Sequence, residues 1–149
     1  MDKVKILVAQ HKEVKVYANE VYMPIQVGKA LSRIDLGIQG DNTGDNISDL
    51  NPFYCELTAQ YWAWKNLRDV EYIGLCHYRR YFHKEFTAFN IDEEMENYDI
   101  ILTKRGMLDM NVLEWYSAKL IPEDIAIFYL YMTYKYRDKI SIFKQFYEC

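Results

Sequence analysis

The sequence has few of the features that mark secreted, membrane-spanning or nucleic-acid-binding proteins. Its 3 cysteines are an odd number without paired spacing, which predicts reduced thiols rather than a disulfide framework. Met1 leads directly into a strand-like run without a signal peptide, so we expect a cytoplasmic protein. The longest apolar run, residues 125–132, is far shorter than the roughly 18–20 residues of a membrane-spanning helix. Without a Lys/Arg block, and with a net charge of −4, the chain is not expected to bind nucleic acid.

Several motifs that mark catalytic or metal sites are also missing. No Gly-Lys-Ser/Thr follows the glycines, so there is no P-loop, and there is neither a G-x-S-x-G elbow nor a zinc-type Cys/His spacing. The chain is instead rich in aromatic residues, with 14 Tyr, 7 Phe and 3 Trp. Tyr and Trp combine an apolar ring with a polar group, so they suit pocket walls as well as cores. The length of 149 residues predicts a single domain, residues 1–149.

Strand-like and helix-like segments alternate along the chain. The predicted strands cover residues 4–9, 21–27, 71–76 and 99–103. The predicted helices cover residues 51–67, 91–97, 122–132 and 138–147. In the first helix, the apolar side chains expected to face the core are Phe53, Leu57, Tyr61, Trp64 and Leu67. This alternation predicts an α/β fold with a largely parallel sheet, flanking helices and a helical C-terminal segment.

The segment HYRRYFH, residues 77–83, directly follows a predicted strand. In open α/β sheets, ligands bind beyond the carboxyl ends of the strands. Arg79 and Arg80 could hold a diphosphate there, because a guanidinium group matches phosphate oxygens bidentately. His77 could carry a proton or orient a phosphate. The alternative is that both arginines pair with carboxylates of the chain and the histidines only end the strand.

The loop GDNTGDN, residues 40–46, is the second candidate. Its glycines permit close approach of a ligand, and Asp41 and Asp45 could bind ribose hydroxyls or a divalent cation. The alternative is a turn stabilised by its own Asp and Asn side chains. His11 and Lys12 end the first predicted strand, at the same edge of the sheet as the arginines.

Five segments together resemble a bacterial family of domains of unknown function that is associated with capsular-polysaccharide and lipopolysaccharide glycosyltransferases. They are KILVAQHK (5–12), VYMPIQVGKALS (21–32), LGIQGDNTGDNIS (36–48), NPFYCELTAQYWAWKNL (51–67) and YIGLCHYRRYF (72–82). The resemblance covers residues 4–104 and implies a Rossmann-like fold similar to the GT-A nucleotide-sugar transferases. We expect the likeness to fade after Gly106, so that residues 1–106 form a nucleotide-sugar-binding core and residues 107–149 a helical segment.

The resemblance also implies roles for individual residues. His11 and Lys12 would lie near the nucleotide, and the helix carrying Glu56, Trp62 and Trp64 would border the cleft. The polar loop beside the site would contain Asp41, Thr43, Asp45 and Asn46. The donor-binding strand end would contain His77, Tyr78, Arg79 and Arg80. Asp41, Asp45 and His77 are the candidates for catalytic groups.

The sequence departs from the wider GT-A pattern because it contains no D-x-D motif. We therefore assign no metal ligands and expect the two arginines to neutralise the diphosphate, with a divalent cation (Mn²⁺ or Mg²⁺) as the alternative. The predicted function is transfer of a sugar from a nucleotide-diphospho sugar to a polysaccharide or lipid-linked acceptor.

Members of this family usually continue past the point where this chain stops, which leaves a second function open. The chain would then be a shortened, non-catalytic nucleotide-sugar-binding or assembly module. It would form a homo-oligomer through the apolar residues of segments 125–132 and 142–146. Peripheral membrane contact is a further alternative, because basic residues flank the C-terminal aromatics; they are Lys135, Arg137, Lys139 and Lys144.

Overall fold

The computed structural model describes residues 2–104, 112–119 and 121–147. The chain forms two compact units, residues 1–103 and residues 104–149, and each is described by itself. The predicted boundary after residue 106 lies outside the described residues, as does Cys149. The assignment of the whole chain to a single domain stays a prediction.

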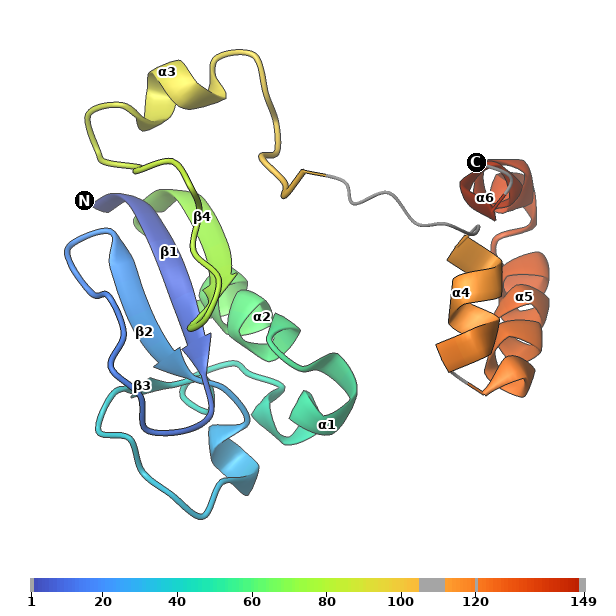
Figure 1. Ribbon diagram of the computed structural model, residues 1–149, viewed down its shortest axis with the longest axis horizontal. Helices are drawn as coiled ribbons and strands as arrows, with labels where there is room; N and C mark the ends of the chain where they lie inside the picture. Colours follow the sequence, from blue (N-terminus) through green and yellow to red (C-terminus); the bar gives the residue numbers. More distant parts are fainter. Residues whose placement is uncertain (1, 105–111, 120, 148–149) are drawn as a thin grey trace. The chain divides into compact units, whose positions relative to one another are not determined.

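The first unit is built on a sheet of four parallel strands. The strands are β1 (Asp2–Gln10), β2 (Tyr22–Gln26), β3 (Gln39–Gly40) and β4 (Val70–His77). They lie in the order β3-β2-β1-β4 (Figure 1), which is the order of the first half of a Rossmann fold. Ala9 lies opposite both Ile25 and His77, so the carboxyl ends of β1, β2 and β4 share one edge of the sheet. The predicted Rossmann-like α/β fold with a parallel sheet is confirmed.

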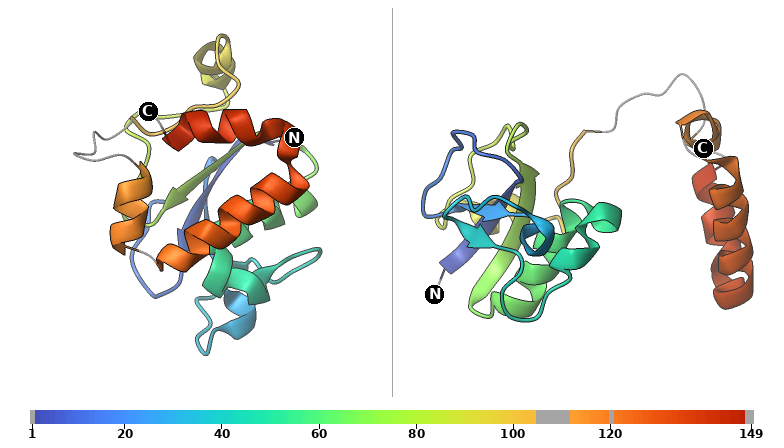
Figure 2. Two further views of the ribbon diagram at one scale, coloured as in Figure 1. Left: turned by 90° about the vertical axis from the view of Figure 1, so that its right-hand side faces the viewer. Right: turned by 90° about the horizontal axis from the view of Figure 1, so that it is seen from below.

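The two faces of the sheet carry separate apolar cores. Successive side chains of a strand point to opposite faces. Leu7 and Ala9 of β1 pack with helix α2 (Leu57–Asn66), whereas Ile6 and Val8 pack with residues around helix α3 (Ile91–Met95). Figure 2 shows these two helices on opposite sides of the strands. The sheet is therefore covered on both faces, as a parallel sheet requires.

The helix predicted over residues 51–67 is two helices, α1 (Asn51–Tyr54) and α2. Most of the side chains expected to face the core do not: Phe53 is 81% exposed and Trp64 is 66% exposed, whereas Leu67 does pack against the core. The buried face of α2 consists instead of Thr58, Ala59, Trp62 and Ala63. Three of these four side chains are small, which lets the helix approach the sheet closely beside the larger Trp62. The predicted stripe is therefore wrong for Phe53, Leu57 and Trp64.

The strand predicted over residues 99–103 is also wrong. Within the described residues this segment pairs with no strand, and Ile100 and Leu102 are exposed. A strand is stable only with a hydrogen-bonded neighbour. The apolar, β-branched composition of these residues is therefore not sufficient to make them a strand.

The second unit is helical, as predicted. It contains α4 (Val112–Lys119), α5 (Pro122–Lys135) and α6 (Ile140–Tyr147), with the 3₁₀ helix η3 (Arg137–Lys139) between the last two. Pro122, Glu123 and Asp124 form the first turn of α5, where a fixed φ and negative charges favour a helix start. In the described parts of the chain, no helix has the length and apolar character needed to cross a bilayer.

Candidate functional site

The end of β4 is a tight turn that carries both arginines. The Tyr78 N–H donates to the carbonyl of Ala9 (3.0 Å), so the chain stays paired with β1 for one residue beyond the strand. The Arg80 N–H then donates back to the carbonyl of His77 (2.8 Å). This turn places Arg79 and Arg80, both exposed, beyond the carboxyl edge of the sheet, the edge at which α/β proteins bind ligands.

The ring of Tyr78 gathers charged and aromatic side chains from two strand ends. The Lys12 Nζ lies 5.7 Å from the ring centroid and the Arg79 Cζ lies 5.3 Å from it, both at cation–π distance. The His11 ring meets Tyr78 edge-on at 5.7 Å. His11 and Lys12, predicted to lie near the arginines because both segments end at the same edge, contact the same Tyr78 ring as Arg79.

A cavity of about 300 Å³ opens beside this turn. Its lining comes from the end of β4, the turn after it and the start of α2; the residues are Glu56, Leu75, Cys76, His77, Arg79 and Arg80. Glu56 is the one carboxylate among these lining residues. The cavity is therefore mainly cationic, with a single negative group at one side.

Among the described residues, the cations at this edge form no ion pair with a carboxylate. Within the described parts of the chain, no carboxylate oxygen lies within 4 Å of the side-chain nitrogens of Lys12, Arg79 or Arg80. The alternative prediction, that both arginines are paired with carboxylates of the chain, is therefore not what the structure shows. Unpaired cations on a cavity wall suit an anionic ligand.

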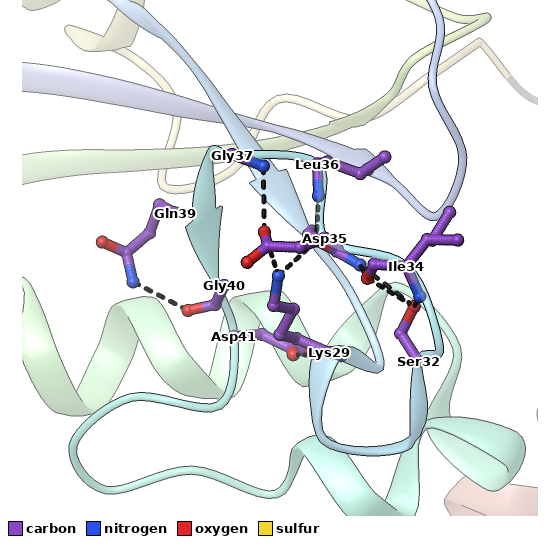
Figure 3. Close-up of polar contacts among 10 residues, drawn as sticks. Lys29, Ser32, Ile34, Asp35, Leu36, Gly37, Gln39, Gly40 and Asp41 are labelled. Atoms are coloured by element: carbon purple, nitrogen blue, oxygen red, sulfur yellow. Dashed lines mark hydrogen bonds and ion pairs between the residues drawn. The ribbon is translucent and has the colours of Figure 1, made fainter.

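Lys29 lies in the connection between β2 and β3 and, unlike Arg79 and Arg80, forms an ion pair with a described carboxylate. Figure 3 shows its ammonium group beside Asp35, and the Asp35 carboxylate also accepts the Gly37 N–H (2.9 Å). The hydrogen bond from Lys29 lowers the pKa of Asp35. The Lys29 Nζ further contacts the buried Gln26 Oε1 at 3.0 Å. Lys29 is thus part of the packing of this connection.

The surroundings of His77 lower its pKa. Burial lowers its pKa, the positive charges of Arg79 and Arg80 lower it further, and Glu56 opposes the shift. Its Nδ1 accepts the Arg79 N–H (3.2 Å), so the remaining proton lies on Nε2. The Nε2 lies 3.6 Å from the Glu56 Oε1. His77 therefore presents an N–H group to the Glu56 carboxylate.

Glu56 reaches the cavity because the helix breaks immediately before it. Cys55 has φ +48° and ψ −129°, a conformation that residues with a Cβ rarely adopt. The Asn51 side chain stabilises the break by donating to the Cys55 carbonyl (2.7 Å). No glycine marks this break in the sequence, so a continuous helix was predicted, and Glu56 was not among the candidate catalytic residues.

We expect the Cys55→Gly variant to be more stable than the wild type by about 1 kcal/mol. Relief of backbone strain of roughly 1–3 kcal/mol outweighs the roughly 0.5–1 kcal/mol of chain entropy that glycine adds to the unfolded state. The matched control is Cys55→Ala, which keeps the strained φ and should unfold like the wild type. Urea unfolding of the three proteins measures the difference, and equal stability of the glycine and alanine variants would contradict a strained Cys55.

Asp41, predicted as a catalytic group, does not line the cavity of Arg79 and Arg80. Its side chain is fully buried, and both carboxylate oxygens are occupied. The N–H groups of Gly28 (2.8 Å) and Lys29 (3.0 Å) donate to it, as do the hydroxyls of Ser48 and Thr58 (2.6 Å). Asp41 joins the β2–β3 connection, the loop after β3 and the start of α2, so its role is structural.

The rest of the loop after β3 contacts α2 and does not line the cavity. The Thr43 hydroxyl accepts the Trp62 indole N–H (2.9 Å). Asp45 is exposed, accepts the Tyr61 hydroxyl (3.2 Å) and lies 3.6 Å from the Lys65 Nζ. Asn46 makes a local turn, in which its side chain accepts the Ser48 N–H (3.1 Å). These predicted site residues are thus separate from His77, Arg79 and Arg80, and a role in binding stays a prediction.

The two described thiols differ in their exposure to solvent. Cys76 is buried, and burial raises its pKa to about 11, whereas Cys55 is exposed. In the Cys149→Ser variant at pH 8, we expect one thiol to react rapidly with Ellman's reagent. The second should react at least ~100-fold more slowly until urea unfolds the chain, because the thiolate is the reacting form. Two rapidly reacting thiols in the folded Cys149→Ser variant would contradict the burial of Cys76.

Metal ligation has no obvious place in this site. In residues 2–104, 112–119 and 121–147, no group of three or more His, Cys, Asp or Glu side chains is arranged to hold a metal ion. Glu56 and His77 are the two potential ligands that line the cavity, apart from the buried thiol of Cys76. Among the residues that line the cavity, Arg79 and Arg80 supply the positive charge that an anionic ligand needs.

Comparison with known proteins identifies the family. A solved structure titled as the apo form of the WbbM bifunctional glycosyltransferase is similar over 51% of this chain and 13% of that one, with 50% identity and a TM-score of 0.49. No curated protein matches the chain. The model of a family described as a domain of unknown function, DUF4422, matches residues 5–148. The match continues far beyond Gly106, where the likeness was expected to fade. The chain belongs to this family.

Proposed function

We propose that this protein is a glycosyltransferase that uses a nucleotide-diphospho sugar as donor. The observation that carries the proposal is the pair Arg79 and Arg80, which line a cavity at the carboxyl edge of a parallel sheet and form no ion pair with a carboxylate of the described residues. A diphosphate leaving group develops negative charge as the glycosidic bond breaks, and guanidinium groups fixed beside it stabilise that charge. The acceptor is a growing surface polysaccharide, of capsule or lipopolysaccharide, or its lipid-linked precursor.

In this proposal the side chains around Tyr78 bind the nucleotide part of the donor. His11, Lys12 and Tyr78 lie next to Arg79 and offer a charge and two aromatic rings within one cluster. An aromatic face can stack with a nucleobase, and an ammonium group can contact the phosphate nearest the ribose. The position of Arg79, between this cluster and the cavity, supports a donor that runs from Tyr78 toward the cavity.

Titration calorimetry with UDP, GDP and dTDP tests the proposal. We expect one of them to bind with a dissociation constant of roughly 1 µM to 1 mM, the usual range for enzyme substrates. Binding should survive EDTA, because the arginines rather than a cation hold the diphosphate; loss of binding in EDTA would favour the Mn²⁺ or Mg²⁺ alternative. Radiolabelled sugar nucleotides of the same bases should then be hydrolysed slowly. A protein that binds none of the three diphosphates would refute the proposal.

A second function is favoured by the exposed apolar side chains of the C-terminal unit. Ile127, Leu130 and Tyr134 of α5 are 63%, 66% and 90% exposed. Exposed apolar patches often mark protein interaction sites. The alternative is therefore a non-catalytic nucleotide-sugar-binding or assembly module that forms a homo-oligomer. Size-exclusion chromatography with light scattering separates the two, because a monomer that turns over donor excludes the assembly function.

A further inference from the structure

We propose that Glu56 is the general base that takes the proton of the attacking hydroxyl, an inference that rests on the glycosyl transfer proposed above. Glu56 is the one carboxylate among the residues that line the cavity of Arg79 and Arg80. Of the aspartates predicted as catalytic, Asp41 is fully buried and Asp45 does not line the cavity. The inference therefore replaces both with a residue that the fold brings beside the arginines.

The backbone around Glu56 is held firmly by neighbouring hydrogen bonds. The Asn51 side chain contacts the Cys55 carbonyl (2.7 Å) and the Thr58 hydroxyl (3.2 Å), and Thr58 in turn donates to the buried Asp41 carboxylate (2.6 Å). These contacts set the start of α2, which begins one residue after Glu56. A base that is positioned before the substrate arrives needs no reorganisation during the reaction.

The Glu56 carboxylate also has a neighbour that can orient it. The His77 Nε2 lies 3.6 Å from the Glu56 Oε1, close enough for the imidazole to attract the carboxylate. His77 is therefore a positioning residue, held in turn by the Arg79 N–H on its Nδ1. This pattern of a carboxylate and an imidazole fixed by a third group resembles other acid–base sites.

The proposed step is balanced without a further reactant. The acceptor oxygen bonds to the anomeric carbon of the donor, while the bond from that carbon to the diphosphate oxygen breaks and its electron pair leaves with the diphosphate. Glu56 takes the proton of the acceptor hydroxyl, and Arg79 and Arg80 offset the charge of the leaving group. When water replaces the acceptor, the same step is hydrolysis of the donor.

The Glu56→Gln variant tests this assignment, because it keeps the shape of the side chain and removes the base. Calorimetry with the nucleoside diphosphate that the wild type binds should give a dissociation constant within about threefold of the wild-type value. Hydrolysis of the corresponding radiolabelled sugar nucleotide should slow by about 100-fold or more, the usual contribution of a general base. The matched control is Glu71→Gln, an exposed position at the other end of β4, which should leave both measurements unchanged.

The outcomes separate the two proposals. If the wild type binds no nucleoside diphosphate, the proposed function is wrong, and the assignment of Glu56 as its base is then wrong as well. If the wild type binds but hydrolyses nothing, the binding-module alternative replaces the enzyme and the assignment of Glu56 is wrong. If the wild type hydrolyses the donor and the Glu56→Gln variant does so within threefold of that rate, the enzyme stands and Glu56 is not its base.

The role of His77 has its own readout. We expect His77→Ala to lower kcat for hydrolysis by about 10-fold with KM unchanged. Because His77 acts through Glu56, the double variant with Glu56→Gln should be no slower than Glu56→Gln alone. Additive losses would show that His77 acts independently of Glu56.

Discussion

Replacing Arg79 and Arg80 together by alanine is expected to weaken binding of the nucleoside diphosphate by about 100-fold or more. A hydrogen bond to a charged group is worth about 1.5–3 kcal/mol, and two guanidinium groups lose at least one such bond each. Neither arginine has an ion pair in the described part of the chain, so their removal leaves no internal carboxylate unpaired. Calorimetry with UDP, GDP and dTDP measures the loss, and urea unfolding should give an unchanged free energy.

Arg68→Ala is the control for this pair. Arg68 is exposed and lies just before β4, at the end of the strand opposite to Arg79, so its loss should not change the dissociation constant. Arg79→Lys with Arg80→Lys keeps the charge but not the bidentate geometry, and we expect an intermediate affinity. If the double alanine variant bound as tightly as Arg68→Ala, the diphosphate site would have to lie elsewhere on the protein.

The second large effect is expected on stability, at Asp41. Asp41→Ala should lower the free energy of unfolding by about 3–5 kcal/mol, which is near the upper end for a single substitution. The variant leaves the N–H groups of Gly28 and Lys29 and the hydroxyls of Ser48 and Thr58 without their buried acceptor. Each unsatisfied buried donor costs roughly 1–3 kcal/mol, which solvent and local rearrangement partly recover. Urea unfolding followed by circular dichroism measures the change.

Asp45→Ala is the matched control, four residues away in the same loop. Asp45 is exposed, and its contacts with Tyr61 and Lys65 are at the surface, where such pairs contribute at most about 1 kcal/mol. We therefore expect a change below ~1 kcal/mol. Equal losses in the two variants would contradict the assignment of Asp41 as the buried anchor of the loop.

The strands show what the local sequence pattern predicts correctly and what it does not. The largely apolar runs over residues 4–9 and 71–76 predicted β1 and β4. Residues 6–9 of β1 are buried on both faces of the sheet, whereas most of the edge strand β4 is half-buried or exposed. The run over residues 99–103 has the same composition, yet it is not a strand, because no described neighbour pairs with it. The composition of a segment shows that it could form a strand. Whether it does so depends on a neighbouring strand with which it can form hydrogen bonds.

Helix α2 shows that the spacing of large apolar residues does not always identify the buried face of a helix. Large apolar side chains at helical spacing predicted the buried face, yet Trp64 is exposed while Ala59 and Ala63 are fully buried. Where the backbones of a helix and a sheet come close, only small side chains fit between them. The hydrophobicity of a residue does not indicate how close the two backbones are. The break at Cys55 was missed because no glycine marks its positive φ, and the hydrogen bond from the Asn51 side chain to the Cys55 carbonyl is not part of the apolar pattern.

The sequence by itself determined that the chain is an α/β protein and that His11, Lys12, Tyr78, Arg79 and Arg80 meet at one edge of its sheet. Strand ends follow from local hydrophobic runs, and parallel strands bring their carboxyl ends together. Only the tertiary structure decided which aspartate of the loop after β3 is buried. Asp41 is fully buried, whereas Asp45, four residues later, is exposed. It also brought Glu56 to the cavity. Burial and the direction of a side chain depend on contacts between segments distant in sequence, and local patterns do not contain them.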